Sequence, residues 1–307
     1  MATEAIRSVF EGTVARRGNS AVVVLSEYWS LTKPEINLLI AITTAAAFCI
    51  GSRASLHFSG WLLLCTLIGT VLVASGAATL NQVIEWRSDA EMRRTARRPI
   101  AAGRIEPTYA LIFGMLLSLT GGLYLGFAVR PAASLLALVA LGGYLLLYTP
   151  LKRCTPMCTL AGAFPGAMPV LIGYVAATGK LDSQAWLLYA ILFLWQFPHF
   201  MAIAWMYRED YARAGYQVLP LGRDRAWFMA WQSVLPALIL VSVTVAPLVL
   251  QRGNPMLVAG TFLLSLGFLY FAARLALIRS NQSARRLLIV SVIYLPLVFG
   301  LEVLARV

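Results

Sequence analysis

Long uncharged stretches alternate with short polar segments along most of the chain. A helix that crosses a bilayer needs about 20 predominantly apolar residues, and most of these stretches reach that length. They occupy residues 35–52, 60–82, 107–128, 132–150, 157–178, 184–206, 226–249, 254–273 and 286–304. The pattern therefore predicts an all-α, polytopic membrane bundle with about nine transmembrane helices.

The segment before the first span has a different character. Residues 1–28 mix acidic and basic side chains and contain no apolar core, which a cleaved secretory signal requires. They include Glu4, Glu11 and Glu27, whereas mitochondrial transit peptides are poor in acids. We expect a soluble, flexible tail at 1–28 and, because no long linker interrupts the remainder, a single membrane domain at 29–307.

Composition agrees with a membrane protein and argues against a cysteine-based site. Hydrophobic residues make up 60% of the chain, charged residues 12%, and the mean hydropathy is +0.76. Soluble domains contain about half apolar and a quarter charged residues. The four cysteines, Cys49, Cys65, Cys154 and Cys158, lie in or beside apolar stretches without redox or zinc spacing. We interpret them as buried small hydrophobic residues.

The net charge of +12 follows the predicted topology. Twenty of the 25 lysines and arginines lie in the N-terminal segment and in the loops after every second span. Because basic residues collect on the cytoplasmic side, we expect the N-terminus inside and the C-terminus outside a bacterial inner membrane, rather than a mitochondrial one. The charge is thus a topology signal, so the lipid bilayer is an expected partner and nucleic acid is not.

The segment NQVIEWRSDAEMRRTARRP (81–99) directly follows an apolar run. Asn81, Glu85 and Asp89 recur every four residues, so on a helix they stack along one face. Such oxygen donors suit Mg²⁺, which binds few carboxylates and shares phosphate ligands. Four arginines that can grip phosphate oxygens follow: Arg93, Arg94, Arg97 and Arg98. The alternative is a solvated surface of paired charges, although polar groups at the end of an apolar run tend to be functional.

Three other segments on the same side carry candidate chemistry. In YTPLKR, Tyr148 and Lys152 lie one turn apart. Lys152 either binds a phosphate or is one of the basic residues that collect on the cytoplasmic side. In WQFPHF, His199 lies inside an apolar span, as a packing residue or a functional one. In YREDYARAGYQVLP, Glu209 and Asp210 either complete a second cation site or cap the next helix.

Together these stretches resemble the UbiA-type intramembrane prenyltransferase superfamily, and within it the branch that farnesylates protohaem IX. The matching segments are LTKPEINLL (31–39), NQVIEWRSDAEMRRTARRPI (81–100), YTPLKRCT (148–155), GAFPGAMPVLIGY (162–174) and LWQFPHFMAIAWMYREDYARAGYQVLP (194–220). The arginine-rich continuation of the second segment and WQFPHF indicate the haem branch. The last three spans are similar only in length and hydrophobicity.

The resemblance implies Mg²⁺ held by Asn81, Glu85 and Asp89, and two substrates, farnesyl diphosphate and protohaem IX. Farnesyl transfer to a haem vinyl group would give haem O for haem–copper oxidases, with haem A synthase or oxidase assembly proteins as downstream partners. Glu85 stands where the superfamily usually has aspartate. Tyrosines at Tyr207 and Tyr211 replace the usual paired aspartates, which leaves a second metal ion open.

The expected catalytic residues are Asn81, Glu85, Asp89, Lys152 and His199. The expected substrate-binding residues are Arg93, Arg94, Arg97, Arg98, Tyr148, Trp195, Gln196, Tyr207 and Asp210. Arg94, Arg98 and Lys152 would stabilise the departing diphosphate, and aromatic rings would shield the allylic cation. His199 is the candidate on the haem side, where it would contact the iron or guide water.

Three alternatives fit part of this pattern. A UbiA-type enzyme that prenylates an aromatic or quinone precursor would share the acidic segment and differ in WQFPHF. A transporter would place ionisable groups near the bilayer midplane, whereas nearly every acid here lies at the inside boundary. A haem-binding chaperone without catalysis would not need the acidic residues.

Overall fold

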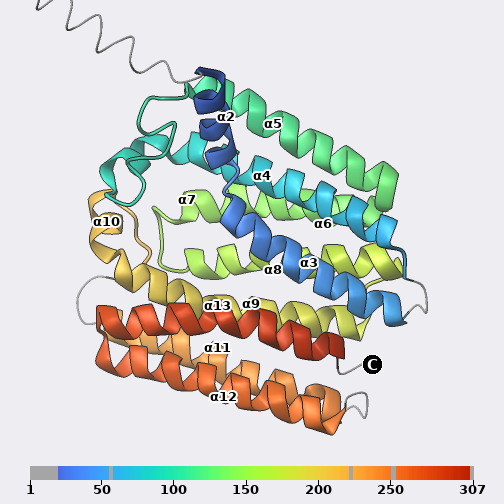
Figure 1. Cartoon of the computed structure of the whole chain (residues 1–307). Helices are drawn as coiled ribbons and strands as arrows, with labels where there is room; N and C mark the ends of the chain where they lie inside the picture. Colours follow the sequence, from blue (N-terminus) through green and yellow to red (C-terminus); the bar gives the residue numbers. More distant parts are fainter. Residues whose placement is uncertain (1–19, 55–57, 221–223, 250–253, 305–307) are drawn as a thin grey trace, which may run out of the picture.

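The computed structural model describes residues 20–54, 58–220, 224–249 and 254–304, and its regular elements there are helical (Figure 1). In this part of the chain nine helical segments are long and apolar enough to cross a membrane. They are α3 (Pro34–Ala54), α4 (Gly60–Glu91), α5 (Pro107–Tyr124) with η1 (Leu125–Val129), α6 (Pro131–Gly142) with η2 (Gly143–Tyr148) and α7 (Thr149–Leu151), α8 (Cys158–Thr178), α9 (Ser183–Met206), α11 (Asp224–Val249), α12 (Pro255–Ile278) and α13 (Asn281–Leu304). The predicted all-α membrane bundle is confirmed.

Helix α4 extends well past the apolar run from which its span was predicted. The run ends near residue 82, but the helix continues through the charged segment to Glu91 and contains 32 residues. A helix of that length is about 48 Å long, whereas the hydrocarbon core of a bilayer is about 30 Å thick. Its last turns can therefore project beyond the apolar layer, and the helix ends at Glu91 rather than at the end of the predicted span, residue 82.

The helices pack side by side in a bundle in which α8 and α9 are the most enclosed. Helix α4 packs on α5, α3 on α8, α8 on α9, and α9 on α11 and α13. The α4–α5 contact depends on small residues, as is common between membrane helices. A Cβ atom added to Gly76 would lie 2.1 Å from Ser118 Oγ, and one added to Gly121 would lie 2.7 Å from the Val73 nitrogen.

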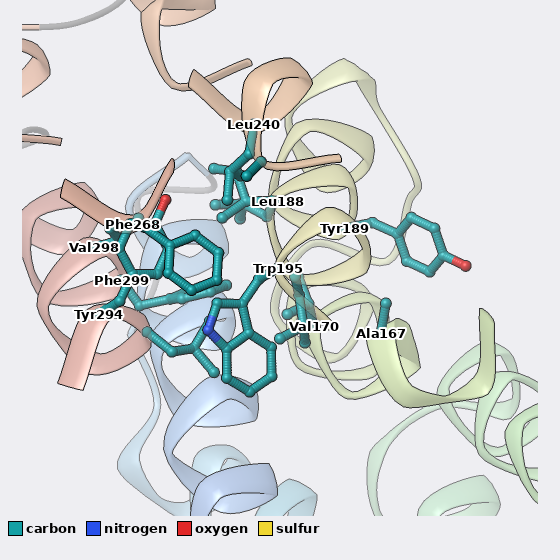
Figure 2. Packing of buried hydrophobic residues seen from close by; sticks show 14 of the residues in the cluster. Ala167, Val170, Leu188, Tyr189, Trp195, Leu240, Phe268, Tyr294, Val298 and Phe299 are labelled. Carbon is teal, nitrogen blue, oxygen red and sulfur yellow. The ribbon is translucent and has the colours of Figure 1, made fainter. Parts of the chain in front are cut away.

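The largest buried cluster surrounds α9. Figure 2 shows Trp195 and Leu188 of this helix beside Phe268 of α12 and Tyr294 of α13. The rings of Phe268 and Tyr294 stack with centroids 4.8 Å apart. The WQFPHF segment therefore lies in the interior of the bundle, where its polar atoms need partners within the protein.

A short helix, α2 (Ser20–Leu31), precedes the first span. Its Glu27 accepts two hydrogen bonds from Arg104, at 2.7 and 3.0 Å. The Leu31 carbonyl accepts a hydrogen bond from Gln82 of α4. The boundary predicted at residue 28 thus falls within a helix that is attached to the membrane domain. The remainder of the predicted tail, 1–19, lies outside the described residues.

One end of the bundle gathers the polar connections. The segment 92–106, α7, and α10 (Arg208–Arg213) lie at this end, as Figure 1 shows. Met92 from the first of these segments is buried against Ala214 and Tyr216, which follow α10. The Gln217 nitrogen donates a hydrogen bond to the Lys152 carbonyl. Three loops far apart in sequence are therefore packed together over the end of α4.

Candidate active site

Asn81, Glu85 and Asp89 form a row along one face near the end of α4, and we call these three residues the α4 row. Their exposed fractions are only 1%, 5% and 1%. Carboxylates so thoroughly removed from water require a positive or hydrogen-bonding partner. The predicted alternative of a solvated charged surface is therefore not what the structure shows.

Each carboxylate of the α4 row is paired with a basic side chain from another segment. Lys152 Nζ lies 2.9 and 3.1 Å from the two oxygens of Glu85. Arg98 Nη1 lies 2.8 and 2.7 Å from those of Asp89. Asn81 donates to Glu85 at 3.0 Å. The segments after α4 and α7 thus converge on the row.

Lys33 belongs to the same cluster. In the sequence it was counted only among the basic residues that indicate the orientation in the membrane. Its Nζ lies 3.4 Å from Asn81 Oδ1. Burial, together with the positive charges of Arg98 and Lys152, lowers the pKa of Lys33 to about 7. Three basic side chains thus face two carboxylates. This crowding of positive charge favours a polyanionic ligand.

Aromatic side chains form the wall of the cluster. Tyr148 lies on η2, a π-helical segment of the kind often found at functional sites. Its ring centroid is 4.5 Å from Lys152 Nζ, and that of Tyr216 is 6.0 Å away. Gly162 makes room for Tyr148, since a Cβ there would lie 2.6 Å from the ring. Tyr216 was missed from the sequence because no spacing connects it with α4.

The second loop reaches the site through Asp210 and Tyr207. The Asp210 carboxylate accepts a hydrogen bond from the backbone nitrogen of Arg94 at 3.2 Å and forms an ion pair with Arg213. The Arg94 guanidinium lies 4.8 Å from the centroid of the Tyr207 ring. Glu209, by contrast, is exposed and lies 3.6 Å from Arg208. In the described ranges no group of three His, Cys, Asp or Glu side chains is placed to hold a metal, which applies to Glu85 and Asp89 as well as to Glu209 and Asp210.

The remaining arginines lie at the edge of the site. Arg93 and Arg97 are exposed, and Arg98 is half-buried against Asp89. The Arg97 carbonyl accepts a hydrogen bond from Arg104, which also binds Glu27 of α2. Arg104 therefore links the loop that carries the arginines to α2, while Arg93 and Arg97 lie at the surface of the loop.

Trp195, Gln196 and His199 lie deeper, on α9. Gln196 donates to the Ala163 carbonyl of α8 at 2.9 Å. His199 and Trp195 both contact Ser291 of α13. His199 precedes Tyr207 by eight residues, about 12 Å along a helix. The predicted residues thus fall into two groups, one at the α4 row and one on α9 within the bundle.

Sequence comparison decides the family. Residues 40–294 match the UbiA prenyltransferase family. The chain belongs to the UbiA prenyltransferase family. Two relatives named protoheme IX farnesyltransferase support this assignment. The one from Solibacter usitatus is 44% identical over 92% of this chain and 99% of its own length. The one from Salinibacter ruber is 43% identical over 89% of this chain and 96% of its own length.

Solved structures have the fold of this UbiA prenyltransferase. A digeranylgeranylglyceryl phosphate synthase superposes with a TM-score of 0.73 and 17% identity, covering 92% of this chain and 98% of its own. A UbiA homolog from Archaeoglobus fulgidus bound to GPP and Mg²⁺ gives 0.68 and 15%, covering 90% and 99%. The protein is therefore an integral membrane prenyltransferase with the UbiA fold.

Proposed function

We propose that this prenyltransferase moves the farnesyl group of farnesyl diphosphate onto a vinyl group of protohaem IX and so produces haem O. The observation that carries the proposal is the 44% identity to a protoheme IX farnesyltransferase across 92% of the chain. The WQFPHF segment adds His199, a polar side chain that is partly exposed within the span of α9.

The α4 row has the chemistry of a Mg²⁺ site. Asn81, Glu85 and Asp89 offer one amide and two carboxylate groups on one buried face, and hard oxygen donors are what Mg²⁺ prefers. Both buried carboxylates already face positive charge, from Lys152 and Arg98, which supports a site that favours cations. These three residues would hold Mg²⁺, which would neutralise charge on the diphosphate. A UbiA homolog solved with GPP and Mg²⁺ supports this use of the fold.

The basic residues around the row would bind the diphosphate. Lys33, Arg98 and Lys152 already converge on Asn81, Glu85 and Asp89. Arg98 and Lys152 can exchange carboxylate oxygens for phosphate oxygens when the substrate arrives, and Lys33 can exchange the amide oxygen of Asn81. Fixed positive charge aimed at a leaving group is the main source of stabilisation in reactions of this type.

The hydrophobic part of the reaction would lie deeper in the bundle. Loss of diphosphate leaves an allylic cation, whose charge Tyr148 and other aromatic rings would stabilise without reacting. The vinyl group supplies the electron pair of the new carbon–carbon bond. Water then adds to the resulting cation and releases a proton, so the products are haem O, diphosphate and H⁺.

We also assign an orientation and a place in haem metabolism. Twenty of the 25 basic residues belong to the side that carries the α4 row, which supports a cytoplasmic site in a bacterial inner membrane. The C-terminus then faces outside. Haem O would pass to haem A synthase or to oxidase assembly proteins.

Competition between two acceptors tests the proposed reaction. Membranes that contain the protein are incubated with radiolabelled farnesyl diphosphate, Mg²⁺, protohaem IX and an aromatic acid. We expect the label in haem. Label in the aromatic acid, with haem unchanged, would support the related prenyltransferase class instead.

A further inference from the structure

Ser291 of α13 contacts two residues of the WQFPHF segment through different oxygens. Its carbonyl accepts a hydrogen bond from Trp195 Nε1 at 2.9 Å, and its hydroxyl oxygen lies 2.7 Å from His199 Nδ1. The Trp195 and His199 rings stack with centroids 4.7 Å apart. One fully buried serine therefore fixes the position of both rings.

The hydrogen atoms around this serine allow one arrangement. Ser291 Oγ also lies 2.6 Å from the Leu288 carbonyl oxygen. Two polar heavy atoms this close need a hydrogen between them, and a hydroxyl supplies only one. Because the carbonyl has none to give, the hydroxyl hydrogen must point to Leu288. The hydrogen between Ser291 and His199 must then be carried by Nδ1.

The consequence for His199 is a defined tautomer. A neutral imidazole protonated on Nδ1 has a free electron pair on Nε2. Within the described residues, His199 makes its single hydrogen bond to Ser291, so Nε2 has no partner there. The side chain is also partly exposed, unlike Ser291. A polar atom left unpaired within an apolar span points to a ligand.

We propose that Ser291 is a positioning residue that holds His199 with Nδ1 protonated, so that Nε2 coordinates the iron of protohaem IX. The inference rests on the proposed function, because it takes protohaem IX as the substrate. Histidine that ligates a metal commonly donates its other ring N–H to an oxygen, which fixes the tautomer and strengthens the ligand. The contacts of Ser291 supply that arrangement.

The tautomer can be measured without any substrate. The chain has two histidines, so His57→Gln leaves His199 as the single source of imidazole nitrogen-15 signals. We expect a protonated Nδ1 and an unprotonated Nε2 in this background. Adding Ser291→Ala should shift the proton toward Nε2, while Ser291→Thr, which keeps a hydroxyl, should retain the original pattern. An Nε2–H signal from His199 in the His57→Gln protein with Ser291 unchanged would overturn the inference.

Iron coordination is tested by comparing two porphyrins. The purified protein is titrated with haem B and with iron-free protoporphyrin IX, and the ratio of the two dissociation constants is taken. We expect the wild type to prefer haem B, His199→Ala to lose that preference, and Ser291→Ala to reduce it by about 10-fold. Ser291→Thr should restore it. Ser265→Ala is the control, because Ser265 is another fully buried serine of the bundle and its hydroxyl contacts Tyr294 rather than His199.

The outcomes separate this inference from the proposed function. If the protein farnesylates haem but His199→Ala keeps the wild-type porphyrin preference, iron coordination by His199 is wrong and the proposed function stands. If the wild type neither binds haem B nor modifies it, both are wrong.

Discussion

Lys152 Nζ lies within 3.1 Å of both carboxylate oxygens of Glu85, although 67 residues separate the two in sequence. Both side chains are almost fully buried, at 12% and 6% exposure. A buried pair of this kind is costly to assemble, because both charges lose water. Such an ion pair contributes little net stability but produces a strong local electric field around Lys152 and Glu85. Its position at the end of α4 is the basis of the predictions below.

Glu85→Gln should lower farnesyl transfer by about 100-fold or more, because it removes charge from the predicted Mg²⁺ site. Glu91→Gln is the matched control. Glu91 lies in the same charged segment but is exposed and off the face of the α4 row. Initial rates in membranes with equal amounts of each protein measure the effect. Equal loss in both variants, or none in Glu85→Gln, would contradict the role of the row.

Lys152→Met should lower both stability and activity. It leaves the Glu85 carboxylate buried without its partner, which costs about 3–5 kcal/mol. The double variant Glu85→Gln, Lys152→Met should recover most of the stability, because no charge is left unpaired, and none of the activity. Thermal unfolding in detergent and the transfer rate separate the two effects. Recovery of activity in the double variant would mean that the pair is structural only.

Gly76→Val should weaken the contact between α4 and α5. A Cβ at Gly76 would lie 2.7 Å from the Gly114 carbonyl oxygen, which belongs to backbone and cannot turn aside. Overpacking of this kind typically costs about 1–3 kcal/mol. Gly142→Ala is the control, since no atom lies within 4 Å of the added Cβ. The midpoint of thermal unfolding should fall for the first variant and stay unchanged for the second.

The orientation can be tested with Cys154, which follows α7 at the end of the bundle that carries the α4 row. All four cysteines were expected to be buried, but the Cys154 thiol is exposed. A membrane-impermeant maleimide should label Cys154 in inverted vesicles and not in intact spheroplasts. A cysteine placed at the exposed Lys180, in a Cys154→Ser background, should show the opposite pattern. Labelling of Cys154 from outside would reverse the proposed topology.

The sequence predicts the transmembrane helices well, because apolar length alone determines whether a segment spans the bilayer. The α4 row was also predictable, since its residues are spaced on one helix. The end of α4 was not, because hydropathy falls at residue 82 while the helical hydrogen bonding continues to Glu91. Residues 20–28 were expected to be flexible because the sequence does not reveal their partners. In the structure Glu27 pairs with Arg104, which belongs to a distant segment.

The partners of the candidate site were harder to predict than its acids. Lys33, Tyr216 and Ser291 each come from a segment remote from the residue that they contact. Nothing in a single sequence indicates which loop folds over which helix. Ser291 in particular lies in the last span, where we saw similarity only in length and hydrophobicity, although the family match extends to residue 294. Its contact with His199 required the structure.

The most direct test of the central claim is mass analysis of haem after the purified protein, in lipid vesicles, is incubated with haem B, farnesyl diphosphate and Mg²⁺. We predict haem that has gained one farnesyl group and one hydroxyl group, and none of this product after a chelator removes the Mg²⁺. Haem that stays unmodified with Mg²⁺ present, or the same yield with chelator, would contradict it.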